Sequence, residues 1–120
     1  MNLTDLDSLG GGRYRVKSSR QPRYMGANII PLKASGGSVS VEVTASAPFG
    51  ATLAVRAADK SVRYIDLTNG KGSVDLRNGE ETSLVVANTP DTLYLYDPFS
   101  PISEVNRGLD YQVQITGASA

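Results

Sequence analysis

Apolar and polar side chains alternate along most of this chain. The clearest run is residues 38–44, Ser-Val-Ser-Val-Glu-Val-Thr, in which every second residue is a valine. In an extended strand, this period of two places the valines on one face and the polar residues on the other. A sheet with one apolar face needs a second layer to cover it, so the pattern predicts an all-β protein built from packed sheets.

Turn-forming dipeptides separate the expected strands. Asn69-Gly70 suits a tight hairpin, because both residue types tolerate a positive φ. Asn78-Gly79 reverses the chain before a strand whose Leu84-Val85-Val86 is apolar on both faces, which predicts a central, doubly covered position. The expected strands are residues 13–18, 24–32, 38–45, 52–57, 62–67, 72–76, 82–87, 92–97 and 109–116. Eight or nine short strands without a helix-period segment predict an antiparallel β-sandwich, jelly-roll-like in topology.

The sequence predicts a short N-terminal tether followed by one domain. Residues 1–12 end in three glycines and are predicted to be a flexible tether, and residues 13–120 to be the β-sandwich domain. The strand at 13–18 alternates weakly and is expected at a sheet edge. Pro31 cannot donate a ladder hydrogen bond, so residues 24–32 are expected to form an edge strand, a bulge or a broken strand.

Composition narrows the function classes. The 120 residues include neither His nor Cys, which removes the commonest acid–base groups, nucleophiles and transition-metal ligands. Lys plus Arg and Asp plus Glu both number 12, so no net charge attracts nucleic acid, and nucleic acid is not an expected partner. No apolar run approaches the ~18 residues of a membrane span, so membrane insertion is not expected either. Residues 1–12 lack the pattern of a signal peptide, so a secretion signal would lie outside this chain.

Catalysis by this chain is not expected. Glu80-Glu81 is the only adjacent acidic pair, and it follows the Asn78-Gly79 turn. Carboxylates on an exposed turn keep ordinary pKa values and make poor general acids, so the pair is interpreted as a solubilising loop.

An aromatic stretch is the first candidate binding site. Tyr94 and Tyr96 share one strand face, and Phe99 lies in the adjoining loop. Rigid aromatic rings give a large contact area at low entropic cost, which suits sugar or peptide ligands. The alternative is that the tyrosines fill the space between the sheets.

An acidic stretch is the second candidate. Asp97, Glu104, Asn106 and Asp110 carry the hard oxygen ligands that calcium prefers. Their spacing matches no EF-hand loop, and a solvated acidic loop is the alternative. Calcium is the only cofactor that these residues suggest.

Several segments together resemble a known kind of module. They are residues 24–32, the glycine turn with 39–43, Ser83 to Pro90, residues 94–97 and the closing run 109–115. These segments resemble C-terminal β-sandwich accessory domains of secreted bacterial peptidases, including the pre-peptidase C-terminal type and jelly-roll domains of uncharacterised exported proteins. The resemblance implies a non-catalytic module that binds substrate or stabilises the enzyme in a larger secreted or periplasmic protein, a metallopeptidase. Its partner would be the catalytic domain of the same polypeptide.

Two other functions stay open. A carbohydrate-binding module would use the aromatic residues as a platform for a glycan. A structural or adhesin-type assembly domain would instead present an unpaired edge strand.

Overall fold

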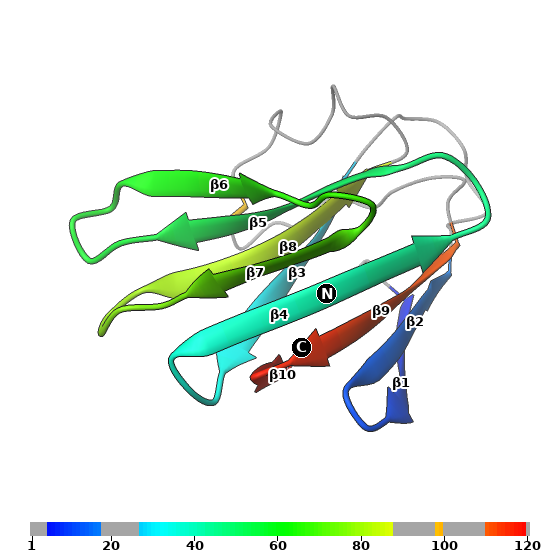
Figure 1. The fold of residues 1–120 in the computed structure, drawn as a ribbon, viewed down its shortest axis with the longest axis horizontal. Coiled ribbons are helices and arrows are strands. Elements are labelled where there is room, and N and C mark those ends of the chain that lie inside the picture. Colours follow the sequence, from blue (N-terminus) through cyan, green and yellow to red (C-terminus); the bar gives the residue numbers. More distant parts are fainter. Residues whose placement is uncertain (1–4, 18–26, 88–97, 100–109, 120) are drawn as a thin grey trace.

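The computed structural model describes residues 5–17, 27–87, 98–99 and 110–119, and every regular element in them is a β-strand (Figure 1). No helix in this part of the chain is long and apolar enough to cross a membrane. The strands are β1 (Asp5–Gly10), β2 (Arg13–Lys17), β3 (Ala27–Ala34), β4 (Ser38–Ala45), β5 (Gly50–Arg56), β6 (Val62–Asp66), β7 (Lys71–Asp75), β8 (Glu81–Ala87), β9 (Tyr111–Thr116) and β10 (Ala118–Ser119).

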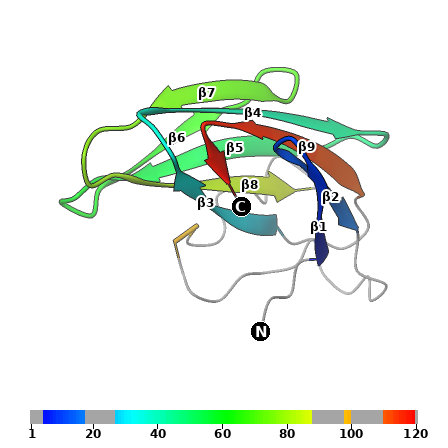
Figure 2. The ribbon, with the colours of Figure 1, turned by 90° about the horizontal axis from the view of Figure 1, so that it is seen from below.

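The strands form two five-stranded antiparallel sheets, which Figure 2 shows as two layers. Sheet 1 has the order β1-β2-β9-β4-β7, and sheet 2 has the order β10-β3-β8-β5-β6. The eight strands from β2 to β9 place β2-β9-β4-β7 against β3-β8-β5-β6, which is the arrangement of a jelly roll. The predicted β-sandwich is therefore confirmed.

The core follows from the alternation of residues along the strands. In β4 the three valines at 39, 41 and 43 are buried, and Leu53 and Leu84 face them from sheet 2 with no exposed surface. Burying a side chain of this size stabilises the fold by about 1.5–3 kcal/mol. The main cluster contains Val16, Ile30, Leu32, Val39, Val41, Val43, Ala51, Leu53, Val55, Val74, Leu84, Val86, Tyr111, Val113 and Ile115.

Strand β8 occupies the centre of sheet 2, as its two apolar faces predict. Residues 82–87 are all buried. Leu84 and Val86 belong to the main core, whereas Val85 and Ala87 cluster with Ile29 on the outer side of the sheet. The apolar run is continuous because side chains on both faces of β8 are buried.

The Asn69-Gly70 turn forms as expected but joins different sheets. Asn69 has a φ of 52° and Gly70 a φ of 79°, and the N–H groups of Thr68 and Lys71 each donate to the other residue's carbonyl, at 2.9 and 3.0 Å. The turn nevertheless carries the chain from β6 in sheet 2 to β7 in sheet 1. A Cβ on Gly70 would lie 2.3 Å from the Val43 carbonyl oxygen, so the turn packs tightly on β4.

The first residues of the chain differ from the expectation of a tether. Asp5–Gly10 forms β1, which pairs with β2, and Gly10, Gly11 and Gly12 all have positive φ, at 85°, 63° and 81°. Glycine adopts this backbone without steric cost, so the triplet makes a hairpin turn. Strand β2 consequently lies between β1 and β9, and the expected edge position of residues 13–18 is wrong.

Pro31 lies where its missing N–H is tolerated. Strand β10 pairs only with Ala34 and Lys33 of β3, while β8 pairs with the opposite side of β3. Among the described residues, the side of β3 away from β8 therefore has no partner at Pro31. At Pro31, β3 is therefore an edge strand among the described residues, which is one of the three alternatives that the proline predicted.

Candidate functional site

The outer surface of sheet 1 is a continuous layer of polar side chains. Alternation turns the valines of β4 inward, so its serines, Glu42 and Thr44 point outward. The outward residues of the four neighbouring strands form what we call the polar face. Its members are Arg13, Arg15, Ser38, Ser40, Glu42, Thr44, Lys71, Ser73, Asp75, Gln112, Gln114 and Thr116.

One row of the polar face runs across four strands. Strand pairing places Gln114 between Arg13 and Glu42, and Glu42 between Gln114 and Lys71. The Arg13 Nε donates to the Gln114 Oε1 at 3.2 Å, and the Gln114 Nε2 donates to the Gly11 carbonyl at 2.8 Å. The Lys71 Nζ lies 3.2 Å from the Glu42 Oε2. These contacts hold the side chains of the row in defined positions.

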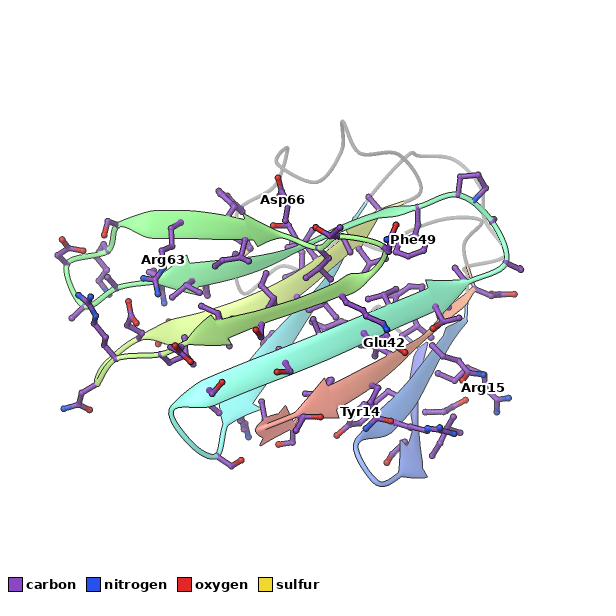
Figure 3. All side chains as sticks on the ribbon, in the orientation of Figure 1. Tyr14, Arg15, Glu42, Phe49, Arg63 and Asp66 are labelled. Carbon is purple, nitrogen blue, oxygen red and sulfur yellow. The ribbon has the colours of Figure 1, made fainter. Side chains whose placement is uncertain are left out.

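Three of the hollows on this face share Glu42 in their lining. A groove of about 660 Å³ extends from Glu42 to Pro48 and Phe49 beyond the end of β4. A second hollow, of about 480 Å³, continues over Ser40 and Ser73, and a third, of about 300 Å³, reaches Arg13. Figure 3 labels Glu42 on β4, with Phe49 at the β4–β5 connection. A shallow polar depression therefore follows β4 along the exposed side of sheet 1.

Phe49 gives the larger groove an apolar end. It is half-buried and packs against the main core. A Cβ on Gly70 would lie 3.2 Å from its ring, so the β6–β7 turn supports the ring from one side. The groove thus combines one ring with the side chains of Glu42, Thr44 and Lys71.

Most of the predicted aromatic site lies outside the described residues. Tyr94 and Tyr96 belong to that part, whereas Phe99 is described and is half-buried. The Arg56 Cζ lies 4.9 Å from the centroid of the Phe99 ring, a cation–π arrangement, and the guanidinium also pairs with Glu81. Arg56 is on the outer side of sheet 2, so Phe99 lies on the layer opposite the polar face.

The candidate calcium ligands are only partly described. Asp97, Glu104 and Asn106 lie outside the described residues. Asp110 is exposed immediately before β9, and it borders a hollow with Arg15 and Tyr111. The part of the chain that the structure describes holds no group of three or more metal-ligating His, Cys, Asp or Glu residues. Calcium binding by these four residues stays a prediction. Asp110 precedes a strand of sheet 1, whereas Phe99 lies over sheet 2, so the two candidate sites do not share a layer in the described residues.

Glu80 is not the solubilising residue that its position in a turn suggested. Its side chain is only 5% exposed and lies 2.6 Å from the Arg63 Nη1. The hydrogen bond from Arg63, followed by one from the Arg77 backbone N–H at 2.6 Å, lowers the pKa of Glu80 below its ordinary value. Arg63 also donates to the Asp75 carbonyl at 3.4 Å. We call this arrangement the Arg63–Glu80 clasp, and it ties β6 to the end of β7 across the two sheets.

Backbone groups at both ends of the edge strand β7 already have hydrogen-bond partners. Arg63 engages the carbonyl of Asp75 at one end of β7, and Thr68 engages both backbone groups of Lys71 at the other end. An adhesin-type assembly through β7 would need these groups for an added strand.

Sequence reasoning did not identify the polar face. The outward residues of β4 and β9 are recognisable from alternation, since Gln112, Gln114 and Thr116 are polar at every second position. Their adjacency is not recognisable, because four other strands, β5 to β8, lie between β4 and β9 in the part of the chain that the structure describes.

The chain was compared with family models, with curated proteins and with solved structures, and none of the three comparisons found a match.

Proposed function

We propose that this chain is a non-catalytic binding module that holds its ligand on the polar face of sheet 1. The observation that supports this proposal is the depression along β4, where three hollows share Glu42 and fixed polar side chains surround it. Ligand sites are concave and contain a few polar groups that orient the ligand. Rigid strands position such groups more accurately than loops do.

The module is proposed to serve a larger secreted bacterial protein, with a metallopeptidase catalytic domain on the same polypeptide. The resemblance of residues 24–32 and 83–90 to accessory domains of secreted peptidases supports this part of the proposal. It requires that the reading frame encoding this chain also encode a zinc-peptidase motif such as HExxH. Sequencing of the complete reading frame tests the requirement, and a frame without any catalytic domain would contradict the accessory role.

Binding is tested by retention on solid ligands. The purified chain is incubated with a panel of insoluble polysaccharides, with peptidoglycan, and with immobilised collagen and casein. The variant carries Glu42→Ala together with Gln114→Ala. The matched control carries Ser35→Ala, which changes an exposed residue outside the polar face and outside the three hollows. We expect retention on at least one solid, lost in the double variant and kept in the control. Absence of retention on every solid, or equal retention of all three proteins, would refute the proposed binding face.

A further inference from the structure

The polar face presents donors and acceptors side by side. The amides of Gln112 and Gln114 offer both, and so do the hydroxyl groups of Ser40, Ser73 and Thr116. These five residues lie on neighbouring strands and surround Glu42. A ligand that matches such a surface must itself donate and accept hydrogen bonds along its whole length, as sugar hydroxyl groups do.

The charges of this surface are balanced. Arg13, Arg15 and Lys71 on the outer side of sheet 1 are accompanied there by Asp7, Glu42 and Asp75. Lys71 is 3.2 Å from Glu42, and Arg13 hydrogen-bonds Gln114. A polyanion needs an excess of cationic side chains, which this face does not supply. The ligand that best matches these balanced charges therefore carries no net charge itself.

The shape of the depression favours a chain-like ligand. The groove at Phe49 and the hollow at Ser40 share Glu42 and Lys71, so they adjoin one another along β4. The strand segment from Ser40 to Thr44 covers about 13 Å, since a strand rises about 3.3 Å per residue. Phe49 at one end offers an aromatic ring, against which the apolar C–H face of a sugar can stack.

We propose that the polar face binds a neutral polysaccharide, laid along β4 from Phe49 to Ser40. This inference rests on the proposed function and specifies its ligand class. Glu42 accepts hydrogen bonds from sugar hydroxyl groups at the centre, Gln114 and Ser40 donate and accept beside it, and Phe49 stacks against a ring at the end of the groove. The site differs from the predicted aromatic platform, because it lies on the sheet opposite the one that Phe99 covers.

The test uses soluble neutral polysaccharides, namely a β-glucan, a xylan, a mannan and an amylose, with heparin and alginate as anionic comparisons. Affinity electrophoresis of the full chain identifies the polymer that retards it, and calorimetry gives its Kd. We expect Glu42→Ala to weaken binding about tenfold, equivalent to about 1.4 kcal/mol, because the variant loses one charged hydrogen-bonding group to the ligand. Ser35→Ala, at an exposed residue outside the polar face, should leave the Kd unchanged, and raising NaCl tenfold should change it less than twofold. Backbone amide shifts on titration should concentrate in β4, β7 and β9.

Three results would overturn the inference. One is failure of all four neutral polymers to retard the chain. Another is binding that high salt abolishes, which would indicate an anionic ligand. The third is binding that Glu42→Ala and Gln114→Ala leave intact while both variants keep the far-ultraviolet spectrum of the wild type. Retention on collagen or casein that depends on Glu42, without retardation by any polysaccharide, would refute this inference and leave the proposed binding function standing.

Discussion

Gly12 provides the most direct test of how the N-terminal hairpin is attached. Its φ is 81°, and its carbonyl accepts a hydrogen bond from the Ile115 N–H at 2.8 Å. A Cβ at this position would lie 2.4 Å from the Ile115 carbonyl oxygen and 3.0 Å from the Gln114 side chain. Gly12→Ala should therefore push the β1–β2 turn away from β9.

The magnitude follows from two separate effects. A left-handed backbone costs a residue with a Cβ about 1–2 kcal/mol. Relieving the backbone contact adds overpacking strain of about 1–3 kcal/mol. Together these effects should lower the free energy of unfolding by about 2–5 kcal/mol. Gly11 separates the effects, because its φ is 63° but a Cβ there would meet no atom within 4 Å. Gly11→Ala should cost only about 1–2 kcal/mol.

Urea unfolding measures both variants, with Gly36→Ala as the matched control. Gly36 has no positive φ and open space around it, so its replacement should change stability by less than about 1 kcal/mol. Hydrogen exchange of the Ile115 amide, followed by NMR, reports on the contact itself. Lost protection at Ile115 with an unchanged urea midpoint would mean that the hairpin detaches locally. Equal stability of Gly12→Ala and Gly11→Ala, with Ile115 still protected, would refute the described docking and restore a tether at residues 1–12.

Two further changes address the core and the clasp. Leu53→Ala removes a fully buried side chain between the sheets and should lower the free energy of unfolding in urea by about 2–5 kcal/mol. Val62→Ala, at a residue that is 39% exposed, should lower it by less than about 1 kcal/mol. Similar losses for both variants would contradict the described core. The lowered pKa of Glu80 means that the clasp stabilises the protein above the ordinary glutamate pKa of 4.5 and that this contribution is lost as the pH falls through the lower, folded-state pKa. Thermal midpoints between about pH 3 and pH 7 should accordingly fall less steeply toward acid for Glu80→Gln than for the wild type, and an unchanged slope would contradict the clasp.

Local patterns predicted most of the strands and their inward faces. The valines of residues 38–44 are buried and their polar neighbours are outward, and Leu84-Val85-Val86 lies in a central strand. Both results depend on the side-chain period of two and on the need to cover apolar surface, which are properties of a short segment. The same reasoning identified the positive φ at Asn69-Gly70.

Properties that depend on distant residues were not predictable in this way. The turn at Asn69-Gly70 has hairpin geometry whether its strands share a sheet or cross between sheets, because its hydrogen bonds are local. The glycines at 10–12 suit both a tether and a hairpin, and only docking on β9 distinguishes the two. The Glu80 side chain pairs with an arginine 17 positions away, and no feature of the turn itself indicates that partner. The polar face likewise requires knowledge of which strands are neighbours.

The central place of β9 in sheet 1 has a consequence for biosynthesis. Arg13 in β2 and Gln114 in β9 are 101 positions apart, yet they lie side by side, and β9 also separates β2 from β4. On a translating ribosome, the facing edges of β2 and β4 emerge early and stay unsatisfied until residues 111–116 appear. Such high contact order is typical of proteins that fold in milliseconds to seconds. A nascent chain interrupted before β9 would therefore expose two strand edges with unpaired backbone N–H and C=O groups. Such edges favour aggregation and chaperone binding.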